Sequence, residues 1–245
     1  MELHFHQREF EYEVRNKLQV FDRSITSEDA RTITELDLTN FDFLVEDKEV
    51  LCCFNSLTSL GINIGTTTPD FWWHFPKLRN LYLCCWGDVV DFESFRKMTD
   101  LGTLCVSGGD LSDIDYINLT ALQELSQLAM LELHEFGSVD IAPLASMTQL
   151  KCFALRYADK VQNIEAIGSM VFLEELVMDG LWIDNLNFLD TLPESVKLEM
   201  CGIHLFHNVD VRKWKRFSNR DICEIEVKNE YWEYIDLSDL STTHM

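Results

Sequence analysis

Residues 172–192 read FLEELVMDGLWIDNLNFLDTL, and the spacing of the apolar residues in this stretch decides the fold. The apolar positions are Leu173, Leu176, Met178, Leu181, Ile183, Leu186, Leu189 and Leu192. This spacing is typical of a repeat unit made of a short strand, a turn and a return segment. One such unit cannot bury its own apolar face, so it requires similar units stacked on either side.

The pattern recurs throughout residues 33–205. The first apolar position of each unit falls at Ile33, Leu57, Leu78, Leu101, Leu128, Leu150, Leu173 and, in a degenerate copy, Ser195. The second and third apolar positions are apolar in all eight units. One long step, between Leu101 and Leu128, indicates an insertion within residues 110–127 and a longer outer segment there. We therefore predict an α/β repeat solenoid of about eight to nine repeats, with a parallel concave β-sheet.

Both flanking segments lack the pattern and are predicted to cap the ends of the solenoid. In residues 1–32, apolar residues at helical spacing predict a helix over 9–20: Phe10, Val14, Leu18 and Tyr12. Thr26 followed by acidic residues predicts a short helix that begins near Ser27. The segment is therefore a helical N-terminal cap.

Residues 206–245 are predicted to form the C-terminal cap. A ninth strand is expected at 222–227, and the basic cluster at 210–217 is expected to form an amphipathic turn. The apolar segment 231–237 is expected to cover the last strand, and residues 241–245 to fray.

The repeats and the N-terminal segment together resemble bacterial internalin-like leucine-rich repeat proteins. The repeats carry the Leu-x-x-Leu-x-Leu pattern, and Ile25-Thr26 followed by a short helix and the strand from Ile33 matches the internalin cap. The resemblance covers nearly the whole chain and implies a curved solenoid that serves as a protein-binding scaffold.

The ninth place of each repeat departs from the family pattern, which has Asn or Cys there. Here the residues are Phe41, Gly65, Trp86, Gly109, Phe136, Ala158, Leu181 and Ile203. Without an asparagine ladder, the backbone groups of the turns need other partners. We expect irregular turns in which nearby Asp and Asn side chains supply some of them, and hence a diverged member of the family.

Charge and composition narrow the functional classes. The 245 residues carry 20 Lys and Arg against 42 Asp and Glu, and residues 33–205 alone carry 9 against 27, a net charge of −18. This charge argues against nucleic-acid and anionic-membrane partners and favours a protein partner that is basic. The first residues are too polar for a secretory signal, and the eight cysteines show no Cys-x-x-Cys pair. We expect a cytoplasmic location and reduced thiols.

The residues between the apolar positions of each strand are expected to face outward on the concave side, because strand side chains alternate. Aromatic and flexible apolar anchors with polar surroundings are typical of protein interfaces. The predicted partner-binding residues are Tyr82, Trp86, Met130, Glu132, His134, Arg156, Tyr157, Glu175, Asp179 and Glu199. The alternative is that these side chains only pack against one another across neighbouring strands.

A second set of acids follows the strands and is predicted to form an acidic rim. Its members are Asp42, Asp70, Asp88, Asp91, Asp110, Asp113, Asp140, Asp159 and Asp184. The functional interpretation is an edge that attracts a cationic protein. The alternative is turn chemistry, because Asp is favoured in turns and at helix starts.

Three functional hypotheses follow. The first is a non-enzymatic protein-binding scaffold that uses the concave face and acidic rim. The second is an inhibitor or immunity-type protein that neutralises a basic enzyme. The third is a thiol-dependent enzyme that uses Cys105 and His134, although no phosphate-binding, hydrolase or metal motif is present and no cofactor or metal is expected.

Overall fold

The computed structural model describes the backbone of residues 1–64, 72–85, 92–111, 117–193, 195–205, 221–222, 225–227 and 233–235. Side chains are described for the same residues except 109–111 and the three segments beyond 205. The structural statements below concern these residues.

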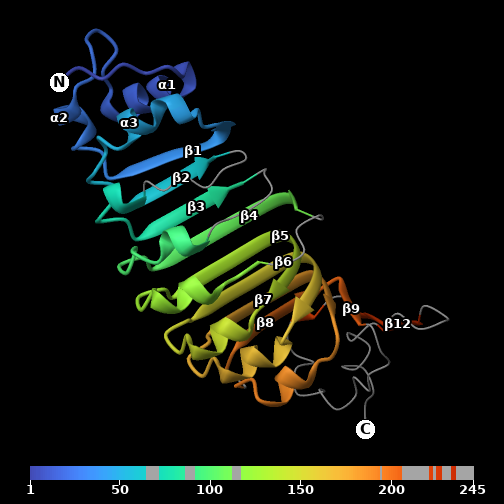
Figure 1. Cartoon of the computed structure of the whole chain (residues 1–245). Coiled ribbons are helices and arrows are strands. Elements are labelled where there is room, and N and C mark those ends of the chain that lie inside the picture. The colour runs from blue at the N-terminus through green and yellow to red at the C-terminus, as the bar shows by residue number, and fades with distance from the viewer. Residues whose placement is uncertain are drawn as a thin grey trace.

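Each predicted repeat contributes one strand to a parallel sheet whose strands follow one another in chain order (Figure 1). The strands are β1 Glu35–Asp42, β2 Ser59–Asn63, β3 Asn80–Cys84, β4 Thr103–Leu111, β5 Met130–Asp140, β6 Cys152–Gln162, β7 Glu175–Ile183 and β8 Lys197–Cys201. The second apolar positions lie opposite one another from Leu36 on β1 to Leu198 on β8, through every strand between them. The register predicted from the repeats is therefore confirmed in all eight units.

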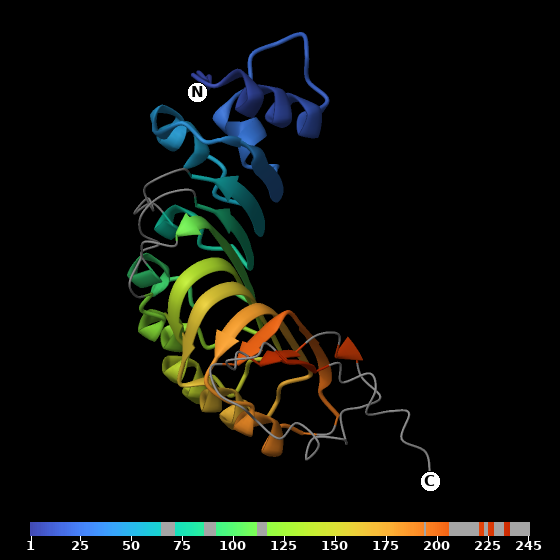
Figure 2. The same cartoon turned by 90° about the vertical axis from the view of Figure 1, so that its right-hand side faces the viewer.

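The return segments run along the outer side of the arc as short helices (Figure 2). They are η1 Val45–Asp47, α3 Lys48–Leu51, η2 Trp72–His74, η3 Phe92–Phe95, η4 Thr120–Glu124, η5 Ala142–Ser146, η6 Ile164–Ser169 and η7 Asn187–Asp190. The core lies between these helices and the sheet. Leu119, Leu122 and Leu125 are buried around η4, as expected for the longer segment.

The N-terminal segment folds into α1 Arg8–Leu18 and α2 Ser27–Ala30 at the end of the sheet (Figure 1). Phe10 and Val14 are buried, whereas Tyr12 is 61% exposed and does not share their buried face. Thr26 and Asp29 form a reciprocal capping box at the start of α2.

In the last four units one backbone kink is repeated, inside β5, β6 and β7 and between β8 and β9, so the bends there are regular and not irregular as expected. Left-handed residues stand at the same place in successive units, with φ of 59° at Glu135, 55° at Tyr157, 61° at Gly180 and 58° at Gly202. Beyond this kink β5 and β6 continue to pair, for example Val139 with Val161. Continued pairing provides backbone hydrogen bonds where an asparagine ladder is missing.

The ninth place of these units is apolar and buried: Phe136, Ala158, Leu181 and Ile203. Asp and Asn side chains also form hydrogen bonds in the turns, as expected. The Asp140 carboxylate accepts the Ala142 N–H at 2.8 Å and the Asn163 side-chain amide at 2.7 Å.

Four short strands lie at the C-terminal end: β9 Ile203–Leu205, β10 Asp221–Ile222, β11 Ile225–Val227 and β12 Glu233–Ile235. β10 extends the sheet in parallel beside β8, β11 pairs in parallel with β9, and β12 is antiparallel to β11. The predicted basic turn at 210–217 and the end 241–245 lie outside the described residues. The chain is thus an α/β repeat solenoid with a parallel concave sheet and N-terminal helices.

Within the described ranges, no helix has the length and apolar character needed to cross a membrane.

Candidate functional site

The predicted partner-binding residues that the structure describes lie on the strands that form the concave side of the arc (Figure 2). They are Tyr82 on β3, Met130, Glu132 and His134 on β5, Arg156 and Tyr157 on β6, Glu175 and Asp179 on β7, and Glu199 on β8. Trp86 lies outside the described residues. These assignments as binding residues remain predictions, because position alone does not show that a partner binds there.

A polar network joins three neighbouring strands near the middle of this face. Glu132 Oε1 lies 2.8 Å from His134 Nε2 and 3.4 Å from Arg156 Nε, and Arg156 also lies 3.7 Å from an Asp179 carboxylate oxygen. Because an ionised carboxylate can only accept hydrogen bonds, His134 Nε2 carries the proton in this contact. The network holds alternating charges in fixed positions across β5, β6 and β7.

The charge state of Glu132 follows from this network. The hydrogen bond from His134 is the largest influence and lowers the pKa of Glu132 from 4.5 to about 2, against the opposing effect of burial. Glu132 is therefore an ionised acceptor at neutral pH.

The Cys105 thiol donates to Glu132 Oε2 at 3.5 Å. Burial, reinforced by the Glu132 charge, raises the pKa of Cys105 to about 12. A nucleophilic cysteine needs a lowered pKa. His134 contacts Glu132 in this network, so the geometry and electrostatics disfavour the thiol-enzyme hypothesis.

A second ion pair lies beside the network, where Lys197 Nζ on β8 is 2.5 Å from Glu175 Oε1 on β7. A shallow depression of about 160 Å³ separates this pair from the network, and its lining includes Met130, Ala154 and Val177. Glu199, two residues after Lys197 on β8, is half-buried and lies opposite Asp221 of β10.

Three large side chains project from the concave face into solvent. Tyr82 is 43% exposed, Met130 39% and Tyr157 54%. Packing against neighbouring strands therefore buries only part of the surface of these three side chains. The exposed remainder provides apolar contact area between fixed charges, which is the usual composition of a protein interface.

Tyr157 is the most unusual of these residues, because a bulky side chain rarely adopts positive φ. Its φ of 55° is shared by Gly180 and Gly202 at the same place in the next two units. The tyrosine ring lies over Gly180, where an added Cβ would be 2.6 Å from Tyr157 Cδ1. The neighbouring Asp179 charge, together with the hydrogen bond that the phenol donates to Asp179, raises the pKa of Tyr157. Asp179 and Gly180 thus position an exposed aromatic ring.

The sequence interpretation did not identify Gly180 as part of this surface. A glycine two places after Met178, directly after an outward-facing acid, was the available signal. Its role depends on the ring of the preceding unit, which strand alternation alone does not reveal.

The acidic rim is only partly described. Asp42 accepts a hydrogen bond from the Asn63 side-chain amide at 2.9 Å, and Asp140 caps its turn as described above. These two contacts support turn chemistry, whereas Asp159 and Asp184 are exposed. The remaining members lie outside the described side chains: Asp70, Asp88, Asp91, Asp110 and Asp113.

The seven cysteines with described side chains are free thiols: Cys52, Cys53, Cys84, Cys85, Cys105, Cys152 and Cys201. Over the same part of the chain, no group of three or more His, Cys, Asp or Glu side chains is arranged to hold a metal ion.

Comparisons with known proteins bear on the fold. No protein-family model matches the sequence, and no curated protein matches it in a sequence search. Solved structures do match. An internalin, InlF from Listeria monocytogenes, aligns with a TM-score of 0.70 and 18% identity over 92% of this chain and 65% of its own. The chain thus spans a little under two thirds of that structure.

Two further structures show the same architecture. Internalin C2 from Listeria monocytogenes aligns with a TM-score of 0.56 and 16% identity, covering 91% of this chain and 86% of its own. The plant peptide hormone receptor RGFR1, solved in complex with RGF2, aligns with a TM-score of 0.58 and 16% identity over 83% of this chain and 34% of its own.

Sequence pattern, strand register and structural similarity agree on the fold. The ninth-place residues and the left-handed turns mark its divergence from the family pattern. The chain is a diverged leucine-rich repeat solenoid with the internalin-like fold.

Proposed function

We propose that this protein is a non-enzymatic scaffold that binds a protein partner on its concave face. The observation that carries the proposal is the exposed aromatic ring of Tyr157. Its backbone is left-handed, a conformation that is unfavourable for a tyrosine, and the next two units have glycine at the same place. A residue held in such a conformation needs compensation elsewhere, and such residues cluster at functional sites. Here Asp179 and Gly180 hold the ring in place, and its exposed surface is left for contact with a partner.

The surroundings of Tyr157 support the same function. The charges of Glu132, Arg156 and Asp179 are already held in place by one another. Binding to a pre-organised surface costs little side-chain entropy. Tyrosine and arginine are also enriched among the residues that dominate binding energy.

Similar solenoids give weaker support. RGFR1 was solved with RGF2, and a second plant receptor kinase ectodomain, GASSHO1/SCHENGEN3 from Arabidopsis thaliana, was solved with CASPARIAN STRIP INTEGRITY FACTOR 2. With identities of 16% and 15%, these structures share only the fold with this chain. We extend the proposal to a cytoplasmic location, following the free thiols of the described cysteines.

Site-specific cross-linking tests the function. A photo-reactive phenylalanine analogue replaces Tyr157 in one variant and Phe172, an exposed aromatic residue in the turn before β7, in the control variant. Both proteins are expressed in the native host and irradiated. We expect a discrete cross-linked protein from position 157 and not from position 172.

A substitution then measures the contribution of the tyrosines. The double variant Tyr82→Ala/Tyr157→Ala should weaken binding of the cross-linked protein by roughly 10-fold or more, as is typical of aromatic anchors. Phe172→Ala should leave the affinity unchanged. If the folded double variant keeps full affinity, the concave-face proposal is wrong.

A narrower candidate is an inhibitor or immunity-type protein that neutralises a basic enzyme. The net charge of −18 over residues 33–205 favours this candidate. It requires that the captured partner be a basic enzyme and lose activity on binding. If the captured protein has no enzymatic activity, the inhibitor hypothesis is wrong, whereas the scaffold function still stands.

A further inference from the structure

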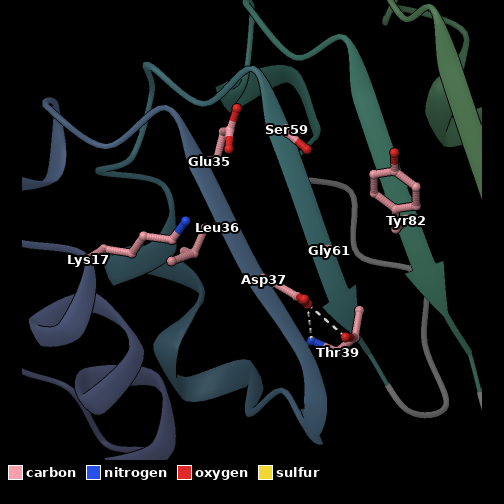
Figure 3. Close-up of a pocket in the computed structure, with 8 residues that line it drawn as sticks. All are labelled: Lys17, Glu35, Leu36, Asp37, Thr39, Ser59, Gly61 and Tyr82. Atoms are coloured by element: carbon pink, nitrogen blue, oxygen red, sulfur yellow. Dashed lines mark hydrogen bonds between the residues drawn. The ribbon is translucent and has the colours of Figure 1, made fainter.

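A separate hollow lies at the N-terminal end of the concave face, between α1 and the first three strands. It has a volume of about 400 Å³. Figure 3 shows its lining residues, which are Lys17, Glu35, Leu36, Asp37, Thr39, Ser59, Gly61 and Tyr82. Its size is that of an ordinary binding pocket.

Gly61 lies buried at the floor of the hollow, where its missing side chain leaves room for the Asp37 carboxylate. Gly61 lies opposite Asp37 on β1 and Tyr82 on β3, at an outward-facing position. A Cβ added there would be 2.8 Å from Asp37 Oδ1 and 3.1 Å from Thr39 Cγ2. Any larger residue would therefore displace the Asp37 carboxylate from its present position.

The carboxylates of this hollow differ from those of the central network in lacking cationic partners. Glu132, Glu175 and Asp179 are each paired with Arg156 or Lys197. By contrast, Glu35 and Asp37 form no ion pair with any described residue.

Among the described residues, Asp37 Oδ1 accepts hydrogen bonds from Thr39 alone, from its N–H at 3.0 Å and its hydroxyl at 2.7 Å (Figure 3). Both carboxylates are exposed to solvent. Two negative charges thus border an unfilled hollow on the same face as the proposed interface.

We propose that this hollow is the anchor site for an arginine side chain of the protein partner, an inference that rests on the proposed protein-binding function. Glu35 and Asp37 are two residues apart on one strand, which places their backbones about 7 Å apart on the same face. A planar guanidinium with five donors can bridge such a pair of carboxylates. Its face can stack on Tyr82, which is 43% exposed at the wall of the hollow.

Lys17 contributes the opposing charge and makes the sign of the ligand testable. Its side chain extends from α1 towards the hollow (Figure 3), and within the described residues it forms no ion pair with Glu35 or Asp37. With two carboxylates and one ammonium group, the lining carries a net charge of −1. A cationic ligand is therefore favoured and should be opposed by Lys17, whereas an anionic ligand would depend on Lys17.

Titration of the full-length, ¹⁵N-labelled protein with short peptides tests the proposal. The probe is acetyl-Gly-Gly-Arg-Gly-Gly-amide, and matched peptides carry lysine, citrulline or glutamate at the centre. We expect saturable amide shifts centred on residues 35–39, 59–61 and 82 with the arginine peptide. The neutral citrulline peptide should bind at least about 10-fold more weakly, because charge-assisted hydrogen bonds are lost.

Variants separate the contributions of the lining residues. Glu35→Gln/Asp37→Asn and Gly61→Ala should each weaken binding of the arginine peptide at least about 10-fold. Lys17→Met should preserve or strengthen binding of the arginine peptide. Glu124→Gln, at an exposed position on η4 on the outer side of the arc, serves as the control and should leave binding of the arginine peptide unchanged.

Several results would overturn the proposal: no saturable shift with the arginine peptide, an equal response to citrulline, preference for the glutamate peptide, or loss of binding in Lys17→Met. The last two would assign the hollow to an anionic group. A stronger response to lysine would assign it to a compact cation that does not use the planar stacking. Each of these results can occur while position 157 still cross-links the partner, so failure of the arginine site is distinguishable from failure of the scaffold function.

Discussion

At the scale of single residues, Gly180 connects the backbone geometry of the turns to the exposed surface. Its φ of 61° favours glycine, and its missing Cβ leaves room for the Tyr157 ring. We expect Gly180→Ala to lower the free energy of unfolding by about 1–2 kcal/mol, from left-handed strain and displacement of the ring. Urea unfolding measures the change.

Gly102→Ala is the matched control for this prediction. Its added Cβ would meet only the backbone oxygens of Arg79 and Gln127, at 3.7 and 3.8 Å, which is ordinary contact. Its free energy of unfolding should stay within about 0.5 kcal/mol of wild type. Equal stability of the two variants would contradict the role assigned to the turn.

Glu132 is the second residue whose environment makes a measurable prediction. Its folded-state pKa of about 2 is below its ordinary value of 4.5, so the ionised carboxylate stabilises the fold above pH 4.5. That stabilisation is lost as pH falls from 4.5 towards 2. Glu132→Gln should therefore cost about 1 kcal/mol near neutral pH, with the difference from wild type shrinking over this range.

Chemical unfolding of both proteins at a series of pH values measures this dependence. Glu124→Gln, at an exposed position on η4, is the control and should show a small difference at every pH. A deficit in Glu132→Gln that stays constant from neutral pH to pH 2 would mean that the carboxylate charge does not stabilise the network.

At the scale of elements, the N-terminal helices are attached to the first repeat by a buried carboxylate. Asp47, in η1, accepts the backbone N–H groups of His6 and Gln7, each at 2.8 Å, and is fully buried. The Gln7 side chain adds a bond from its amide to the Asp42 carbonyl at 2.7 Å. These contacts lie next to the start of α1, where a negative charge is also favoured by the helix dipole.

Asp47→Asn should detach this cap in part and lower the free energy of unfolding by about 2–4 kcal/mol, because buried donors lose a charged acceptor. Hydrogen exchange should report faster exchange throughout α1. The neighbouring Glu46→Gln is exposed in the same helical turn and should have little effect. Unchanged exchange in α1 would show that other contacts hold the cap.

At the scale of the whole molecule, the charge of −18 over residues 33–205 should influence association with the partner. Two acids of the central network share the Arg156 guanidinium, so most of the net field comes from the acids elsewhere along the solenoid. We expect the affinity of the cross-linked partner to fall as sodium chloride rises from about 50 to 500 mM, because exposed charges are screened. Affinity that does not change with salt would contradict a basic partner.

Most of the fold could be predicted from the sequence, because burial of the repeated apolar positions is a local and periodic signal. Leu36 through Leu198 lie opposite one another as the spacing predicted. The repeated unit at 172–192 specified both the parallel sheet and its register. Slippage by one residue would have exposed every apolar side chain of a strand.

The turns and the functional surface required the tertiary structure. The left-handed column through Glu135, Tyr157 and Gly180 depends on backbone pairing between neighbouring units, which has no fixed side-chain signature in this chain. Strand alternation placed Tyr82 on the concave face correctly, whereas Tyr157, one place beyond the alternating set, is exposed where its left-handed backbone interrupts the alternation. Alternation also did not reveal which charges are paired.

The sequence by itself thus determined the solenoid, its register and its outward-facing residues, because these follow from periodic burial along the chain. Only the tertiary structure decided that Glu132 and Asp179 are compensated while Glu35 and Asp37 border an open hollow. Those differences arise from distances between side chains on separate strands, and such distances exist only after the units have stacked.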